Sequence, residues 1–163
     1  MTHVLIAVDD TDTSIRAASA AHRLFGDDAT YTVINVAPNA SLMWGETRLE
    51  TGAVHPLVPM PGLMSGTPLG VPVATAPDEV VAERTDDAER QAGLVAEEAG
   101  IVGARPVGDV GDASEAILSA AHDFDADVIV LGTHDRGWFS RLLTGSVSSD
   151  VLRHADVPVL VAR

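Results

Sequence analysis

The 163-residue chain contains no cysteine and no lysine, and no run of apolar residues in it is long enough to span a membrane. The absence of cysteine excludes disulfide bonds, thiolate catalysis and metal centres with cysteine ligands. The absence of lysine excludes a Walker phosphate-binding loop, whose consensus requires that residue. Because the first residues lead directly into a strand-like segment without a basic and apolar leader, we expect a cytoplasmic protein with no membrane segment.

Acidic residues dominate the charge of the chain, and the formal net charge is -14. This charge repels nucleic acid backbones and anionic lipid surfaces, so neither is an expected partner. All ten basic residues are arginine, and aspartate is twice as frequent as glutamate, a composition similar to that of proteins from salt-accumulating halophiles. At molar salt the Debye length falls to about 3 Å, so the mutual repulsion is screened and the acidic surface chiefly maintains solubility.

The spacing of apolar residues predicts one domain, residues 1–163, in which strands alternate with helices. Such alternation is typical of a doubly wound α/β fold with a parallel sheet covered on both faces. Residues 38–78 contain seven of the nine prolines and show no periodicity, which predicts a long irregular loop. The predicted strands are 3–8, 30–36, 104–110, 127–132 and 157–163, and the predicted helices begin at Thr13 or Ser14, after Asp78, at 111–114 and at Ser146.

Two helices carry more detailed expectations. The first is predicted to use the hydroxyl of Thr13 or Ser14 as its N-cap. The second is predicted to end at Gly100, and its segment 85–98 reads as a solvated acidic face without a catalytic role. The predicted buried stripes are Ile15, Ala18, His22 and Phe25 in the first helix and Ala88, Ala92, Val95 and Ala99 in the second.

Ligands of open α/β sheets bind outside the carboxyl ends of the strands, where the strand order reverses. The first strand ends at Asp9 and Asp10 rather than in G-x-G-x-x-G, which disfavours a nicotinamide cofactor. The two carboxylates could hold a metal or a ribose, or they could simply form a turn. Near the end of the chain, Gly132 and Gly145 flank a segment that backbone amides could make into a phosphate cradle, although glycine also ends strands for purely structural reasons.

Three segments, LIAVDDTDTS at 5–14, GDASEAIL at 111–118 and residues 127–163, resemble the universal stress protein family in order and spacing. The likeness covers most of the chain except residues 39–78. It implies a Rossmann-like five-stranded sheet of order 3-2-1-4-5 and a homodimer paired through the last strand, here 157–163. The ATP-binding branch of that family carries G-x2-G-x9-G-S/T, and this chain matches it except that Asp135 replaces the second glycine.

The resemblance implies an adenine nucleotide, ATP or AMP, with Mg²⁺ as a companion of the phosphates. Ala7, Val8 and Asp9 would then lie beside the adenosine and Val36 beside the adenine. The residues implied at the ribose or the phosphates are Leu131, Gly132, Asp135, Gly145, Ser146, Val147 and Ser148.

Asp135 is the departure from the family motif that bears on the choice of nucleotide. Two like charges 4 Å apart repel by about 1 kcal/mol in water and by about 4 kcal/mol at an effective dielectric constant near 20. A carboxylate at this position therefore disfavours a triphosphate more than a monophosphate. AMP, an altered nucleotide or no nucleotide at all stay open as readings of the site.

Two functional hypotheses follow. The first is a stress-response or sensing module that binds an adenine nucleotide and turns over at most slowly, because no lysine, base or arginine clamp is placed by motif for phosphoryl transfer. No catalytic residue and no resident metal site are assigned. The alternative is a nucleotide-free homodimeric stress protein that acts through protein partners.

Overall fold

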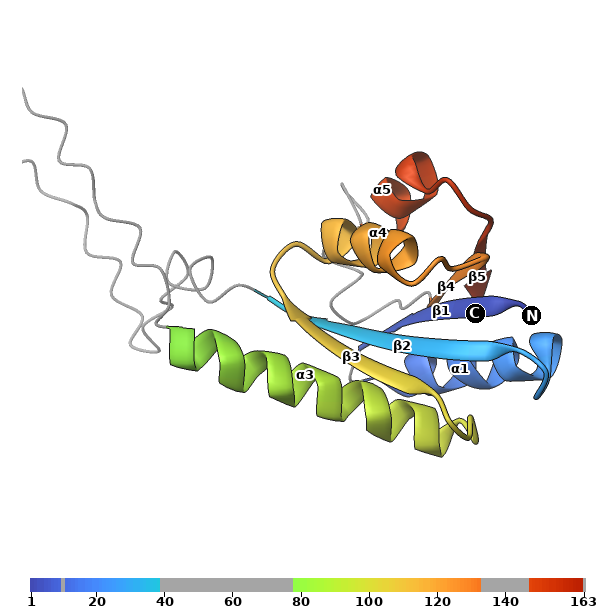
Figure 1. Cartoon of the computed structure of the whole chain (residues 1–163), viewed down its shortest axis with the longest axis horizontal. Helices are drawn as coiled ribbons and strands as arrows, with labels where there is room; N and C mark the ends of the chain where they lie inside the picture. Colours follow the sequence, from blue (N-terminus) through green and yellow to red (C-terminus); the bar gives the residue numbers. More distant parts are fainter. Residues whose placement is uncertain (10, 39–77, 133–146, 163) are drawn as a thin grey trace, which may run out of the picture.

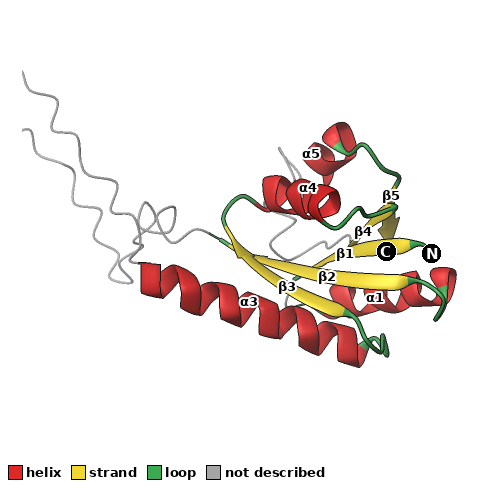
Figure 2. Ribbon diagram, viewed as in Figure 1, coloured by secondary structure: helices red, strands yellow, loops and turns green. Residues whose placement is uncertain are grey.

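The computed structural model describes residues 1–9, 11–38, 78–132 and 147–162. Their five strands form one parallel sheet in the order β3-β2-β1-β4-β5, which confirms the doubly wound class and the strand order that the resemblance implied. Figure 1 and Figure 2 show α1 and α3 on one face of this sheet and α4 and α5 on the other. The elements in chain order are β1 (His3–Val8), α1 (Asp12–Phe25), β2 (Thr30–Ala37), α3 (Asp78–Glu98), β3 (Arg105–Val110), α4 (Ala113–Asp123), β4 (Val128–Gly132), α5 (Val147–His154) and β5 (Val159–Ala162).

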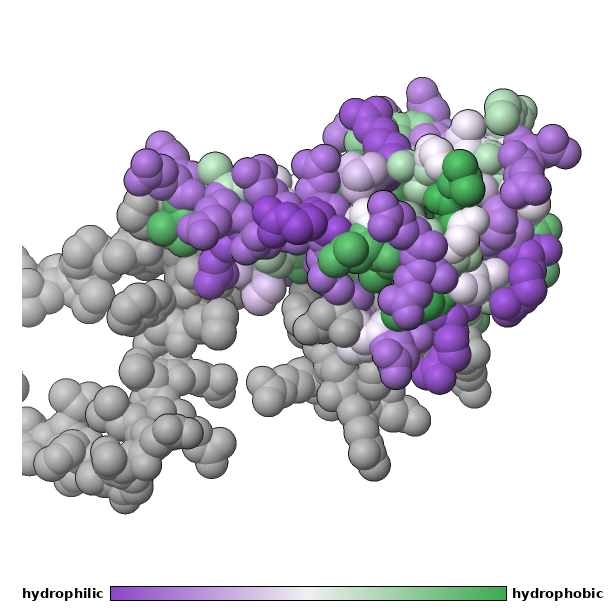
Figure 3. Space-filling model, turned by 90° about the horizontal axis from the view of Figure 1, so that it is seen from below, coloured by the Kyte–Doolittle hydropathy of each residue, from purple (hydrophilic) through white to green (hydrophobic). Residues whose placement is uncertain are grey.

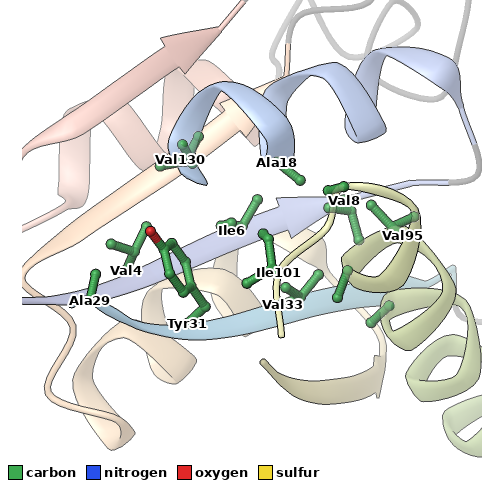
Figure 4. Close-up of a cluster of buried hydrophobic side chains, with 14 of the residues drawn as sticks. Val4, Ile6, Val8, Ala18, Ala29, Tyr31, Val33, Val95, Ile101 and Val130 are labelled. Carbon is green, nitrogen blue, oxygen red and sulfur yellow. The ribbon is translucent and has the colours of Figure 1, made fainter. Parts of the chain in front are cut away.

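The central strand β1 is buried from Val4 to Val8, which explains its unbroken apolar run. Its side chains alternate between two hydrophobic layers. Val4, Ile6 and Val8 pack into the layer under α1 and α3, as Figure 4 shows, whereas Leu5 and Ala7 pack into the layer under α4 and α5. The strand therefore separates two cores, and both reach its carboxyl end.

The element bounds differ from the sequence predictions by a few residues. β2 continues to Ala37, and β5 occupies Val159–Ala162 rather than 157–163. The predicted irregular loop lies almost wholly outside the described residues, since α3 already begins at Asp78. Among the helices that the structure describes, none is both long enough and apolar enough to cross a membrane.

The start and the buried face of α1 correct the prediction. The helix begins at Asp12 after the N-cap residue Thr11, which makes no side-chain cap hydrogen bond. Small side chains face the sheet and allow the helix to lie close to it: a Cβ on Gly132 of β4 would be 3.5 Å from the Cβ of Ala17. Of the predicted stripe, only Ala18 is fully buried. The buried residues of α1 are Thr13, Ser14, Ala17, Ala18 and Ala21.

The helix α3 lies directly on β3, and Gly108 is the residue that allows this. A Cβ at Gly108 would be 2.1 Å from the carbonyl oxygen of Thr85 and 2.5 Å from the amide nitrogen of Glu89. These two groups belong to the α3 backbone, which cannot move aside as a flexible side chain can. The predicted stripe from Ala88 to Ala99 is buried, and Figure 3 shows mostly hydrophilic side chains on the outer face of this side of the molecule.

Candidate functional site

A cavity of about 380 Å³ lies at the carboxyl ends of β1 and β2, between the middle of α3 and the start of α4. This volume is within the roughly 300–1,000 Å³ that small-molecule sites occupy. Both hydrophobic layers contribute to its wall, Val8 from one and Ala7 and Ile117 from the other. The lining residues are Ala7, Val8, Asp9, Ile34, Asn35, Val36, Ala37, Pro38, Arg84, Asp87, Ala88, Gln91, Ala113 and Ile117.

Asp9 is the buried charged residue among the described residues of this wall, and the residue is only 7% exposed. One carboxylate oxygen, Oδ1, accepts hydrogen bonds from the hydroxyls of Thr11 (2.5 Å) and Ser14 (2.6 Å) and from the backbone amide of Thr11 (3.2 Å). The Ser14 hydroxyl also accepts from the backbone amide of Asp9 at 2.8 Å. The hydroxyls near the start of α1 therefore hold Asp9 rather than cap the helix.

The second carboxylate oxygen, Oδ2 of Asp9, is buried and has no hydrogen-bond partner among the described residues. Buried polar atoms are nearly always paired, and one that is not calls for an explanation. An ionised carboxylate oxygen can only accept, so the group that would pair with it is a donor such as a hydroxyl or an amine. Asp9, a residue of the cavity wall, is thus held through one oxygen, while the other lacks a donor among the described residues.

The helix α3 supplies a polar wall opposite β1. Arg84 Nη1 donates to the carbonyl oxygen of Pro38 at 2.9 Å, which ties α3 to the end of β2. Asp87 accepts a hydrogen bond from Arg90 on its own helix. Arg84 is the only cation among the described residues that line the cavity. The wall therefore mixes one arginine, one paired carboxylate and the amide of Gln91.

Four of the predicted site residues line the cavity: Ala7, Val8, Asp9 and Val36. Leu131 pairs with Ala7 in the neighbouring strand β4 but is not among the described lining residues.

The rest of the predicted site falls in three groups. Gly132 ends β4, and a Cβ there would make ordinary contacts with α1, so packing alone does not require glycine. Val147 is buried in the same hydrophobic layer as Ala7, and Ser148 is half-buried in the first turn of α5. Asp135, Gly145 and Ser146 lie outside the described residues.

Sequence reasoning missed the contribution of α3. The segment 85–98 was expected to be a solvated face, and Asp87 is indeed exposed, but Asp87 also borders the cavity and Gln91 is half-buried in its wall. Helical spacing carried a signal, because Arg84, Ala88 and Gln91 follow each other at steps of four and three residues and so share one side of a helix. The spacing did not show that this side of the helix faces the carboxyl ends of β1 and β2 as well as the hydrophobic core.

A metal centre was one reading of the aspartates after β1. Among the described residues no group of three or more histidine, aspartate or glutamate side chains is placed to hold a metal ion. Asp10 itself lies outside the described residues.

Comparison with known proteins decides the family. The family model described as Universal stress protein family matches residues 52–163. The chain belongs to this family. Stress response protein NhaX of Bacillus subtilis (strain 168) is 31% identical over 94 residues, which cover 55% of this universal stress protein and 54% of the relative. The chain therefore spans about half the length of that curated relative.

Solved structures agree with the fold. A universal stress protein in complex with cAMP aligns with a TM-score of 0.59 at 18% identity, over 99% of this chain and 96% of that one. Universal stress protein UspA from Lactobacillus plantarum aligns with a TM-score of 0.58 at 25% identity, over 99% of this chain and 97% of that one. The Rossmann-like α/β arrangement is thus shared with members of the family.

Proposed function

We propose that this universal stress protein binds an adenine nucleotide in the cavity at the carboxyl ends of β1 and β2, and that it acts as a sensing module in the stress response with little or no turnover. The observation that carries the proposal is the buried carboxylate of Asp9, whose Oδ2 has no partner among the described residues. A ribose hydroxyl is a donor suited to this oxygen, and a hydrogen bond to a charged acceptor is stronger than a neutral one.

The rest of the cavity suits a nucleoside. Val36 at the end of β2, together with Val8 and Ala88, provides apolar surface for a flat base. The sheet order places β2 on one side of β1 and β4 on the other, so a nucleotide held at Asp9 with its base over β2 directs its phosphates toward Gly132. The relative solved with cAMP shows that one protein of this fold binds an adenine nucleotide. When ATP is the ligand, Mg²⁺ would accompany its phosphates.

The proposal is tested by titration calorimetry with AMP, cAMP and ATP in multimolar KCl with Mg²⁺. We expect at least one nucleotide to bind the native chain. Asp9→Asn is the informative variant: it keeps an oxygen for the donors from Thr11 and Ser14 and places an amide NH₂ where Oδ2 was.

The Asp9→Asn variant should bind at least tenfold more weakly, and Asp127→Asn at the opposite end of the sheet should bind as the native chain does. If the native chain binds none of the three nucleotides, the proposal is wrong. If Asp9→Asn binds with native affinity, the ribose does not contact Asp9.

The choice between ATP and AMP rests on Asp135, which stands where the family motif has a glycine. Replacing it with glycine removes a negative charge and should strengthen ATP binding more than AMP binding. Equal gains for both nucleotides would show that the carboxylate does not act on the terminal phosphates.

A second copy of the chain is the partner that we propose for β5. This strand forms one edge of the sheet, and Val159, Leu160 and Val161 are only half-buried. An apolar edge strand offers backbone groups and side chains for pairing with another chain. Light scattering should report a dimer for the native chain and a monomer for Val161→Lys. A stable dimer that binds no nucleotide would favour the alternative of a protein that acts through partners alone.

A further inference from the structure

Two side-chain amides stand at the α3 end of the cavity. Asn35, near the end of β2, and Gln91, on α3, both line the cavity and are both half-buried. Neither side chain makes a hydrogen bond to another described residue. Asn35 shares its face of the sheet with Val33, because side chains alternate along a strand, and Val33 packs into the layer under α1 and α3. Both amides therefore belong to the same side of the sheet.

The strand order tells which part of a nucleotide would reach these amides. Asn35 pairs with Val8 of β1 on one side and with Gly108 of β3 on the other, so it lies on the side of Asp9 away from β4. A ligand held by its ribose at Asp9, with phosphates toward β4, has its base over β2 and against α3. This placement rests on the function proposed above.

We propose that Asn35 and Gln91 are the residues that select adenine among purines. A side-chain amide offers a carbonyl acceptor beside an NH₂ donor. On its N6/N7 edge adenine presents the complementary pair, the N6 amino donor beside the N7 acceptor, and asparagine and glutamine read this edge on nucleic acids. Hypoxanthine and guanine present two acceptors on the same edge, O6 and N7. The amide carbonyl then faces an acceptor whichever way the amide is turned.

The position of α3, which carries Gln91, is fixed relative to β3 and to the end of β2. Gly108 allows the backbone of α3 to rest on β3 at Thr85 and Glu89, and the hydrogen bond from Arg84 to Pro38 joins the helix to the end of β2. The amide of Gln91 is thus attached to a rigid element rather than to a loop, which is the arrangement that selective binding sites require.

The experiment is titration of the native chain and of Gln91→Met and Asn35→Leu with the 5′-monophosphates of adenosine, inosine and guanosine. These substitutions keep the side-chain size and remove the amide. The native chain should prefer the adenosine nucleotide by roughly tenfold to a hundredfold, the discrimination typical of a good bidentate pair. Each variant should lose most of that preference. Glu97→Gln is the matched control, since Glu97 also lies on α3 and shares a neighbouring groove with Gln91, outside the cavity wall.

The outcomes separate the two proposals. If adenosine monophosphate binds and both variants keep the native preference, the inference about the amides is overturned while the proposed function stands. If the native chain binds none of the three nucleotides, the proposed function fails and the inference fails with it. Because both variants replace half-buried side chains, circular dichroism checks that each keeps the native fold. If one variant fails to fold, the nucleotide preference of the other decides the question.

Discussion

An aspartate side chain binds a backbone amide at each end of β1, but the aspartate at the carboxyl end has a buried oxygen without a partner among the described residues. At the amino end, the backbone amide of His3 donates to Oδ2 of Asp127 at 2.7 Å, and the amide of Asp127 donates back to the carbonyl oxygen of His3 at 2.8 Å. The ring nitrogen Nε2 of His3 lies 2.9 Å from the hydroxyl of Thr32. At the carboxyl end, Asp9 is held through one oxygen only, and the other has no partner among the described residues.

Burial gives this difference its energetic meaning. Asp127 is exposed, so water can complete whatever its protein partners leave open. Asp9 is 7% exposed, and leaving a buried acceptor unpaired costs about 1–3 kcal/mol. A ligand that donates to Oδ2 of Asp9 recovers this free energy on binding. The amino end is a hydrogen-bonded connection open to water, whereas the carboxyl end contains one buried acceptor that no described residue pairs.

The largest effect is expected from Gly108→Ala, which acts on the carboxyl end alone. The new methyl group would meet the α3 backbone at 2.1 Å, so α3 must move away from β3 and the cavity must widen. We expect a loss of about 3 kcal/mol in the free energy of unfolding, at the upper end for overpacking, together with weaker nucleotide binding. Urea denaturation and calorimetry measure the two effects. If Gly108→Ala is as stable as the native chain, the backbone of α3 is not in close contact with β3 at this position.

A smaller effect is expected from Ser14→Ala. The Ser14 hydroxyl accepts from the amide of Asp9 and donates to its Oδ1, and Ser14 is 3% exposed. Its removal leaves a buried donor unpaired and should cost about 2 kcal/mol of stability. Because Asp9 then has fewer anchors, nucleotide affinity should fall as well. A variant that loses stability but keeps full affinity would show that the anchors do not position the carboxylate for the ligand.

Asp127→Ala is the matching change at the amino end. It removes one hydrogen bond to the exposed amide of His3, and the expected cost is about 1 kcal/mol of stability. Nucleotide affinity should be unchanged, because the site lies at the other end of β1. Measuring melting temperature and affinity together tests the separation of the two ends. A fall in affinity comparable to that of Ser14→Ala would contradict it.

A third carboxylate, Asp112, sharpens the comparison because its partners are all local. It caps α4, where Oδ1 accepts from the hydroxyl of Ser114 at 2.6 Å and from the amide of Glu115 at 3.0 Å. The bond from Ser114, and then that from Glu115, lowers the pKa of Asp112 below its ordinary value of 3.8. The unfolded chain therefore binds this proton more readily, so the stabilisation is complete above pH 3.8 and is lost as the pH falls through the lower folded pKa.

Asp112→Ala should cost about 1 kcal/mol at pH 7, a typical value for losing an N-cap side chain. The gap in stability between the native chain and this variant should narrow as the pH falls below 3.8. Urea denaturation at a series of pH values from 7 to 3 measures that gap. A gap that stays constant over the series would mean that the cap does not depend on the charge.

The sequence predicted the sheet well where burial is complete. The apolar run of β1 is continuous because the strand is covered on both faces, and the alanine and valine stripe of α3 repeats at helical spacing because it faces the sheet. The order of the strands came from the family resemblance, since alternation of strands and helices fits several doubly wound folds.

The site was predicted only in part, because some side chains have alternative hydrogen-bond partners and because some contacts join residues far apart in the sequence. Thr11 and Ser14 can each cap a helix or bind a carboxylate, and the choice depends on where Asp9 lies in three dimensions. Gln91 was assigned to a solvated face, and Arg84 was not singled out, because nothing local in the sequence shows that α3 passes over the end of β2. Gly108 gave no local signal either, because its partner is the backbone of a helix about twenty residues earlier in the chain.

The cavity touches Val8 in one hydrophobic layer and Ile117 in the other, although the sheet separates these layers everywhere along the buried part of β1. A molecule bound there would therefore contact both hydrophobic layers at once and connect the helices on the two faces of the sheet. Amide hydrogen exchange should slow in α3 and α4 together when the site fills, even though the two helices lie on opposite faces. Under the proposed function, such a link would make the rigidity of both helix layers depend on whether the nucleotide is bound.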